Sequence, residues 1–155
     1  MPKIKTGTKV PDFSLPTTGG GTWSLKDAAG ERLVIYFYPR DMTSGCTREA
    51  QEFRDHYAAF RQAGTQVVGV SRDSVASHDK FSSREALPFP LLADADEKVC
   101  RLFGVIRQKS LYGRKYLGVE RSTFLLDGAG RLAREWRNVK VPGHVEEVLE
   151  AARSS

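Results

Sequence analysis

A continuous apolar run from Leu33 to Tyr38 constrains the fold of this chain more than any other stretch. The run consists of β-branched, aromatic and leucine side chains and lacks the alternation of a half-exposed strand. Such a pattern is typical of a strand buried on both faces of a sheet. Pro39 ends the run, because proline has no amide hydrogen to donate to a neighbouring strand. The run therefore predicts a central strand of an α/β sheet with helices on both faces.

An amphipathic helix is predicted directly after this strand. Its apolar side chains recur at helical spacing, and they are Cys46, Ala50, Phe53, Tyr57 and Phe60. The polar face is predicted to carry Arg48, Glu49, Gln51, Glu52, Arg54 and Asp55. Thr43 or Ser44 is a suitable N-cap, and Gly64 is the predicted end of the helix. Cys46 then falls in the first turn.

The position of Cys46 favours a reactive thiol. Backbone N–H groups in the first turn of a helix lack helical acceptors, and the helix dipole favours negative charge there. We therefore expect a depressed pKa for this thiol, and the thiolate is the nucleophilic form of cysteine. A cysteine at a helix start can also be a small buried apolar residue. The local sequence alone leaves both interpretations open.

Alternating strands and helices are predicted around this unit. Residues Asp12 to Leu25 predict a short hairpin, and Gln66 to Ser71 predict a second buried strand. Ser74 is a suitable cap for a helix that runs to about Glu85. Strand, helix and strand in this order, with short connections, imply parallel pairing and a right-handed crossover.

Fewer signals mark the carboxyl-terminal half. Asp94 or Asp96 is a suitable cap for a short helix that contains Cys100 and ends at Gly104. Residues 105–119 are polar and interrupted by glycine, and no element is predicted there. The remaining predicted elements are a strand from Arg121 to Leu126, its hairpin partner from Arg131 to Trp136 and a closing helix after Gly143.

Composition predicts one globular domain that spans residues 1–155. The chain contains 24 lysines and arginines against 19 aspartates and glutamates, a formal net charge of +5. Because the two signs interleave along the predicted elements, we expect no nucleic-acid-binding stripe. No stretch is long enough to cross a bilayer, so no membrane contact is expected. Residues 1–5 contain no apolar signal segment, so the cytosol is the expected compartment. The most concentrated basic cluster, in a predicted loop that is one candidate for docking a reductant, is Arg107, Lys109, Arg114 and Lys115.

Neither a disulfide framework nor a metal site is predicted. Two cysteines, Cys46 and Cys100, are too few for such a framework. The three histidines, His56, His78 and His144, are scattered without ligand-like spacing. We expect all three to be solvated helix residues.

Pro39, Thr43 and Cys46 form a P-x-x-x-T-x-x-C pattern after the buried strand, and this pattern resembles the active-site motif of the peroxiredoxins. Arg121, in the segment ERSTFLL, matches the setting of the arginine that the family carries on a later strand. Further segments occur at spacings similar to those of the PrxQ subgroup, also called bacterioferritin comigratory proteins. They are GCTREA, GVSRDS, FPLLAD and RSTF, and the resemblance covers roughly residues 5 to 150.

This resemblance implies a thioredoxin-like fold, with a central mixed β-sheet, helices on both faces and an N-terminal β-hairpin. It also implies a thiol-dependent peroxidase, without a cofactor, that reduces hydrogen peroxide and organic hydroperoxides. Cys46 would be the peroxidatic nucleophile, and Thr43 and Arg121 would hold the peroxide. Pro39 would shield the sulfur from water, and Glu49 would orient Arg121.

The regenerating step departs from the pattern of the relatives. Many PrxQ-like chains carry a resolving cysteine five residues after the peroxidatic one, where this chain has Gln51. Others carry it in the following helix, at a position that aligns with Ser82 or with Ser83. The chain is therefore either a natural one-cysteine enzyme or a variant in which serine replaces cysteine at residue 82.

Cys100 is the remaining candidate for a resolving thiol, although a buried core residue is the favoured interpretation. Without a resolving thiol, the oxidised Cys46 must be reduced by thioredoxin, glutaredoxin or glutathione. The resemblance also implies a monomer. Two alternatives stay open: a thiol–disulfide exchanger on the same fold, which Thr43 disfavours because a second cysteine is expected at its position, and a non-catalytic basic adaptor or nucleic-acid-binding domain.

Overall fold

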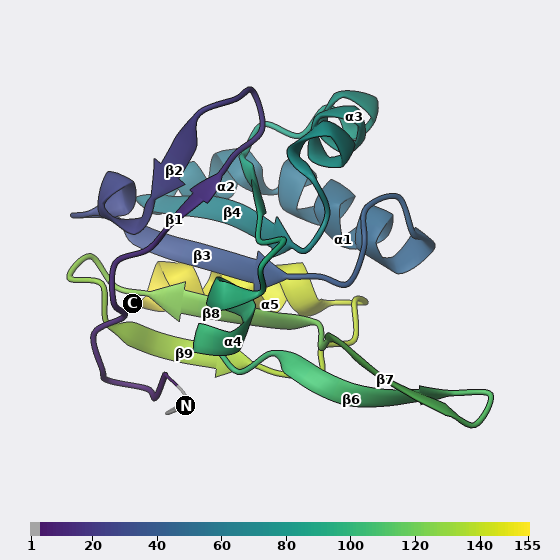
Figure 1. Cartoon of the computed structure of the whole chain (residues 1–155). Coiled ribbons are helices and arrows are strands. Elements are labelled where there is room, and N and C mark those ends of the chain that lie inside the picture. The colour runs from purple at the N-terminus through teal and green to yellow at the C-terminus, as the bar shows by residue number, and fades with distance from the viewer. Residues whose placement is uncertain (1–3) are drawn as a thin grey trace.

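The computed structural model describes residues 4–155 and is built around a five-stranded mixed sheet of order β5-β4-β3-β8-β9 (Figure 1). β3 pairs in parallel with β4 and antiparallel with β8, so it lies at the centre, as its apolar run predicts. β4 is parallel to β5, and β8 is antiparallel to β9. The bounds are β3 Arg32–Phe37, β4 Thr65–Ser71, β5 Leu91–Ala93, β8 Ser122–Leu126 and β9 Leu132–Trp136. The predicted α/β class and mixed sheet are confirmed.

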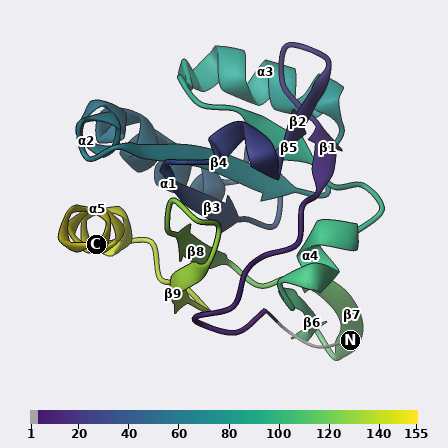
Figure 2. The ribbon, with the colours of Figure 1, turned by 90° about the vertical axis from the view of Figure 1, so that its left-hand side faces the viewer.

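Helices lie on both faces of this sheet (Figure 2). Those with assigned bounds are α1 Ser44–Asp55, α2 Tyr57–Gln62, α3 Val75–Glu85, α4 Lys98–Leu102, α5 His144–Ser154 and the 3-10 turn η1 Leu25–Ala28. α1, α2 and α5 cover one face, whereas α4 and the N-terminal segment cover the other. The helix predicted to run to Gly64 is divided at His56, whose φ of −100° and ψ of 3° separate α1 from α2.

Two apolar cores follow from the alternation of side chains along β3. Leu33, Ile35 and Phe37 point into the core that also holds Cys100. Val34, Tyr36 and Tyr38 point into the opposite core, which holds Cys46. The two cysteines are therefore separated by the central sheet.

Two predicted local features are confirmed. The N-terminal hairpin forms from β1 (Ser14–Pro16) and β2 (Thr22–Ser24). Ser74 caps α3, because its Oγ accepts a hydrogen bond from the Ser77 N–H at 3.1 Å. At α4, the N-cap position is occupied by Glu97, at a φ of 62°, so the prediction of Asp94 or Asp96 there was wrong. The Asp94 carboxylate nevertheless accepts hydrogen bonds from the first-turn amides of Val99 and Cys100, at 3.3 and 2.7 Å.

The segment without a predicted element is a hairpin of β6 (Ile106–Leu111) and β7 (Arg114–Val119). Its turn uses Tyr112 and Gly113, with φ values of 52° and 76°. Positive φ at both central positions is the geometry of a type I′ turn, which follows the twist of the paired strands. The placement of the basic cluster in a loop was therefore wrong, since all four cations lie on these two strands.

The prediction for the histidines was also wrong for two of them. His78 and His144 are buried, with exposed fractions of 0% and 6%, whereas His56 is half-buried. Thr123 Oγ1 lies 2.8 Å from Nε2 of His144, and burial lowers the pKa of that imidazole to about 4. His144 is therefore a neutral, hydrogen-bonded residue of the core.

Within residues 4–155, no helix has the length and apolar composition to cross a membrane. The prediction for the amino end lies partly outside the described residues, because it includes residues 1–3. The assignment of residues 1–155 to one domain stays a prediction.

Candidate active site

Cys46 lies in the first turn of α1, at the carboxyl end of β3. Thr43 occupies the N-cap position, and the first helical hydrogen bond runs from the Thr47 N–H to the Thr43 carbonyl at 2.8 Å. The amides of Ser44, Gly45 and Cys46 precede that bond and have no acceptor in the preceding turn. Cys46 itself is 1% exposed, so its sulfur is enclosed while it lies at the positive end of the helix.

Arg121 brings a fixed positive charge to this sulfur from the start of β8. Its Nη2 lies 3.4 Å from Cys46 Sγ, and its Nη1 donates to Glu49 Oε1 at 2.6 Å. Sequence analysis predicted all three residues, and the structure brings them together. The sequence analysis did not identify Gly45 as part of the site. A Cβ at this position would lie 3.2 Å from Arg121 Nη2. Gly45 therefore allows the guanidinium to approach the helix start closely.

Glu49 was predicted on the polar face of α1, and this was wrong because its exposed fraction is 0%. Burial raises the pKa of Glu49 to about 7, and the nearby Arg121 guanidinium offsets only part of that effect. Glu49 Oε2 is buried without a hydrogen-bond partner in the described chain. The Glu49 carboxylate thus holds Arg121 through one oxygen, while the burial of its unpartnered second oxygen costs free energy.

We expect Glu49→Gln to remove a pH dependence from the free energy of unfolding. With a pKa of about 7 in the folded protein and 4.5 as the ordinary value, Glu49 favours the folded state at low pH. That contribution is lost as the pH rises through about 7. Between about pH 5 and 8, the wild-type protein should lose roughly 2–3 kcal/mol relative to the glutamine variant. Urea unfolding of both proteins across this range measures the difference, and parallel stability curves would contradict the buried carboxylate.

Thr43 and Pro39 lie in the segment between β3 and the first turn of α1. The Thr43 side chain is exposed, and its hydroxyl donates to the Arg40 carbonyl at 3.0 Å. Its hydrogen is thus engaged, and its lone pairs are available to a donor such as a peroxide O–H. Pro39 is half-buried at the end of β3.

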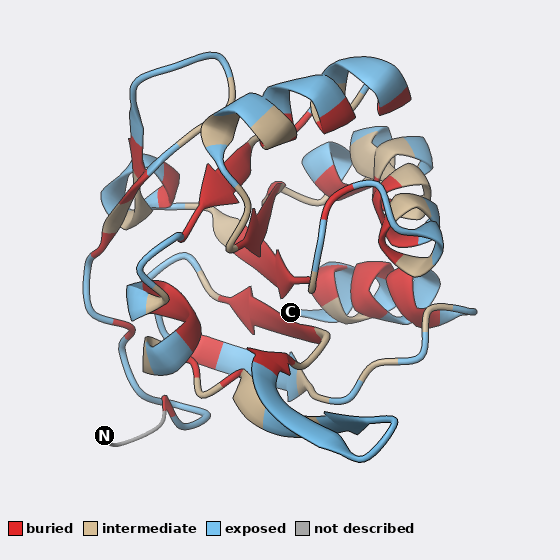
Figure 3. Ribbon diagram, turned by 45° about the vertical axis from the view of Figure 1, so that its right-hand side comes forward, coloured by how far each residue is buried: buried red, intermediate tan, exposed pale blue. Residues whose placement is uncertain are grey.

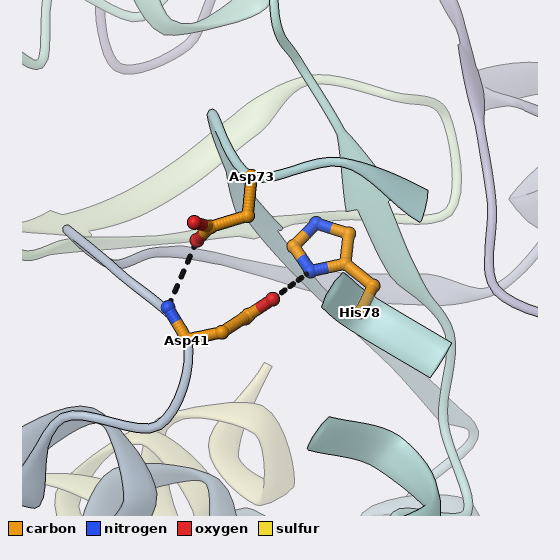
Figure 4. Close-up of side chains that lie close together, drawn as sticks. All are labelled: Asp41, Asp73 and His78. Carbon is orange, nitrogen blue, oxygen red and sulfur yellow. Dashed lines mark hydrogen bonds and ion pairs between the residues drawn. The ribbon is translucent and has the colours of Figure 1, made fainter. Parts of the chain in front are cut away.

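A buried polar network anchors this loop and was not predicted (Figure 4). Asp41 Oδ1 accepts from the Tyr38 hydroxyl at 2.6 Å, and Oδ2 accepts from Ser77 Oγ at 2.8 Å and lies 2.7 Å from His78 Nδ1. The Asp41 amide donates to Asp73 Oδ2 at 2.8 Å. The network therefore ties the loop to β4 and α3.

Hydrogen-bond partners account for the cluster without a metal ion. His78 Nε2 lies 3.0 Å from the carbonyl of Leu92, which can only accept, so this nitrogen carries a hydrogen. Burial raises the pKa of Asp41, but the hydrogen bonds from His78 and Tyr38 more than offset it and leave a lowered pKa. The ionised Asp41 carboxylate accepts from the hydroxyls of Tyr38 and Ser77, and His78 Nδ1 lies 2.7 Å from its Oδ2. Asp41, Asp73 and His78 thus form a charge-assisted hydrogen-bond network.

We expect Asp41→Ala to lower both stability and the rate of peroxide reduction. Met42, the next residue, has a φ of 64°, which is strained for a residue with a side chain and persists only where neighbours impose it. Release of the loop would displace Thr43, and a shift of about 1 Å can cost up to ~100-fold in rate. We expect a fall of ~10-fold in kcat/KM for hydrogen peroxide.

The matched control is Ser74→Ala, which removes the cap of α3 and leaves the loop contacts in place. It should lower the melting temperature and spare the rate. Asp41→Asn should recover much of the activity, since its amide can donate to a neutral His78. A folded Asp41→Ala variant with the wild-type rate would contradict the anchoring role.

The candidate positions for a resolving cysteine lie apart from the sulfur or carry no thiol. Cys100 is buried in the core on the other side of the sheet. Burial, followed by the nearby Asp94 carboxylate, raises the pKa of its thiol. Ser82 is half-buried on α3, and Gln51 on α1 donates to Glu85 Oε1 at 2.8 Å.

Comparisons with known proteins identify the family of this chain. The model of the AhpC/TSA family matches residues 6–134. The chain is 48% identical over 143 residues to Peroxiredoxin Bcp of Xanthomonas campestris, covering 92% of this chain and 89% of that protein. It is 46% identical over 150 residues to Peroxiredoxin Bcp of Bacillus subtilis, covering 97% and 96%.

A solved structure of the Xanthomonas campestris bacterioferritin comigratory protein, which concerns its alkyl peroxide reduction activity, is similar to this chain. Its TM-score is 0.88 at 48% identity, with 92% of this chain and 90% of that chain covered. A thioredoxin-like fold with a cysteine, an arginine and a threonine at one helix start defines the peroxiredoxin class. The chain belongs to the AhpC/TSA family and, within it, to the Bcp or PrxQ peroxiredoxins.

Proposed function

We propose that the chain is a thiol-dependent peroxidase that reduces hydrogen peroxide and organic hydroperoxides through Cys46. The observation that supports this most is the 3.4 Å contact between Cys46 Sγ and Arg121 Nη2 at the first turn of α1. A helix start and a guanidinium both favour a thiolate. Together they form a site suited to nucleophilic attack by sulfur.

In the proposed reaction, the thiolate attacks the nearer oxygen of the hydroperoxide and the O–O bond breaks. The sulfur is oxidised to sulfenic acid, and the other oxygen leaves as water or an alcohol after it takes up a proton. Negative charge moves from the sulfur to the leaving oxygen. A donor that is fixed and permanently charged stabilises this shift without reorganisation.

Arg121 would supply that donor, and Glu49 would orient it through the 2.6 Å ion pair. The Thr43 hydroxyl would accept a hydrogen bond from the peroxide O–H through a free lone pair. Pro39 would form part of the pocket wall. These roles follow from the chemistry and the position of each residue, and each role can be tested by substituting that residue.

We propose that regeneration depends on an external thiol, such as thioredoxin, glutaredoxin or glutathione. The separation of Cys46 and Cys100 by the sheet argues against an internal disulfide, which needs Cα atoms within about 7 Å. Serine at residue 82 and glutamine at residue 51 supply no thiol. The proposal includes a monomer in the cytosol, where thiol reductants are kept reduced.

Thiol–disulfide exchange without peroxidase activity is the alternative function on this fold. It is disfavoured because Thr43 stands where an exchanger is expected to carry its second cysteine.

Mass spectrometry after one equivalent of hydrogen peroxide tests the proposal. We expect one oxygen atom to be added to Cys46, a dimedone adduct at the same residue and no bond to Cys100. Dithiothreitol should then restore the thiol and support repeated consumption of peroxide. An unmodified Cys46 under these conditions would remove the proposed activity.

A further inference from the structure

The β6–β7 hairpin is an exposed surface that the peroxidase chemistry does not use. Figure 3 shows most of it as exposed where it projects from the body of the molecule. In the described chain, the exposed large apolar side chains are Met42 at 41%, Leu111 at 57%, Tyr112 at 96%, Tyr116 at 46% and Leu117 at 53%. Four of these five lie on the hairpin. Single exposed apolar residues are common on protein surfaces, whereas a group of them is typical of an interaction surface.

The hairpin also carries most of the net charge of the protein. Residues 106–119 include Arg107, Lys109, Arg114 and Lys115 and contain no aspartate or glutamate, a formal charge of +4. The whole chain has a net charge of +5, so the remainder is close to neutral. A surface that is both apolar and basic is complementary to an acidic partner with an apolar patch.

The base of the hairpin adjoins the active site. β7 ends at Val119, and Glu120 alone separates it from Arg121. Lys109 Nζ donates to the Val119 carbonyl at 2.7 Å. Burial, followed by the positive charge of Arg121, lowers the pKa of Lys109, and the negative charge of Glu120 is the main influence that opposes this. The hairpin is thus fixed at its base, beside the site, and free at its tip (Figure 1).

Geometry allows one partner to reach both the hairpin and the sulfur. At about 3.4 Å per residue, the tip is roughly 20–25 Å from Arg121 along β7. A domain of ~100 residues, with a radius of gyration of about 13 Å, spans that distance. Because Cys46 is 1% exposed, the sulfur itself offers little surface for recognition. Affinity for a protein reductant must come from the surrounding surface.

We propose that the β6–β7 hairpin docks an acidic protein dithiol that reduces oxidised Cys46. This inference rests on the proposed peroxidase function and adds the surface that selects the reductant. A thiolate of the partner attacks the sulfenic sulfur, an S–S bond joins the two proteins, and hydroxide leaves as water after protonation. The second thiol of the partner then attacks its own bonded sulfur and releases the Cys46 thiolate. The partner leaves oxidised as an intramolecular disulfide.

Steady-state kinetics with a bacterial thioredoxin of net negative charge as the probe test this proposal. Two double variants remove one property each: Leu111→Ser with Tyr112→Ser, and Arg114→Gln with Lys115→Gln. The control is Lys9→Gln with Lys26→Gln, which removes the same amount of positive charge from two exposed lysines. Both lysines line a different pocket, beside the turn at residues 127–130, and lie outside the hairpin.

We expect each hairpin variant to raise KM for thioredoxin by about 10-fold or more. The rate constant for hydrogen peroxide and turnover with dithiothreitol should stay at the wild-type level. KM of the wild-type protein for thioredoxin should rise with salt, and the charge variant should lose that salt dependence.

Unchanged KM in both hairpin variants would overturn the proposal. So would a fall in the peroxide rate constant, which would assign the hairpin to the substrate pocket. Salt-dependent binding of single-stranded DNA that is lost in the hairpin variants, with KM for thioredoxin unchanged, would assign it to nucleic acid instead. Failure of the wild-type protein to consume peroxide with dithiothreitol would be a failure of the proposed function and is measured separately.

Discussion

Replacing Cys46 with serine is expected to abolish peroxide reduction, whereas Cys100→Ala should keep a rate close to that of the wild-type protein. A serine hydroxyl at the helix start does not ionise at neutral pH, so the site loses its nucleophile. We expect the rate of hydrogen peroxide consumption to fall by ~1,000-fold or more. Cys100 lies across the sheet from Cys46 and has no part in the proposed cycle. Peroxide consumption with dithiothreitol as the reductant measures both effects.

Thermal unfolding of the two variants is the control, because Cys100 is fully buried and its truncation leaves a small cavity. A Cys100→Ala variant that unfolds cooperatively but has lost thioredoxin-driven turnover would identify Cys100 as a resolving residue. A Cys46→Ser variant that still reduces peroxide would move the chemistry elsewhere in the protein.

The centre of the fold was predictable because its residues are buried without interruption. The apolar run at 33–38 predicts β3, and the observed strand covers Arg32–Phe37. The helix after it follows from the spacing of Ala50 and Phe53, both fully buried in α1. Burial leaves a continuous apolar run in the strand and a helical spacing of apolar residues in the helix. Short connections then imply parallel pairing of β3 with β4.

The β6–β7 hairpin was not predictable by the same means. Both of its faces are largely solvated, so no alternation of apolar and polar side chains marks its strands. Its turn uses Tyr112 at a positive φ where asparagine or aspartate is the usual signal. The features that hide the hairpin from pattern analysis, exposed aromatic and basic side chains, are those that indicate a docking surface.

Within the site, the residues of the sequence motif were predictable, but the residues that hold the motif in place were not. Asp41 and His78 are distant in sequence and meet only because α3 packs beside the loop after β3. One signal was available: Asp41 follows β3 and Asp73 follows β4, and the carboxyl ends of parallel strands share an edge. Gly45 left no signal, because its function depends on the path of Arg121.

Arg121→Ala is expected to lower kcat/KM for hydrogen peroxide by ~100-fold or more, as the loss of one well-placed donor costs ~2.7–4 kcal/mol in the transition state. The guanidinium touches the sulfur and the Glu49 carboxylate at the same time, through different nitrogens. Its loss removes the donor and leaves Glu49 buried without a countercharge. Arg121→Lys keeps the charge but cannot reproduce the two directed contacts, so its rate should lie between those of the wild-type and alanine proteins. Stopped-flow measurement of peroxide reduction by the prereduced proteins gives all three rates.

Arg137→Ala is the matched control for the loss of a partly buried arginine. Arg137 donates to the carbonyls of Phe103 and Gly104 at 2.9 and 3.1 Å and lies over the ring of Phe124, so its removal should lower stability. It makes no contact with Cys46, and its peroxide rate should stay near the wild-type value. Equal losses of rate in the two alanine variants would point to general destabilisation. A large loss of rate in Arg121→Ala but not in Arg137→Ala, with partial recovery in Arg121→Lys, would show that the reaction needs a positive charge at the sulfur while the O–O bond breaks.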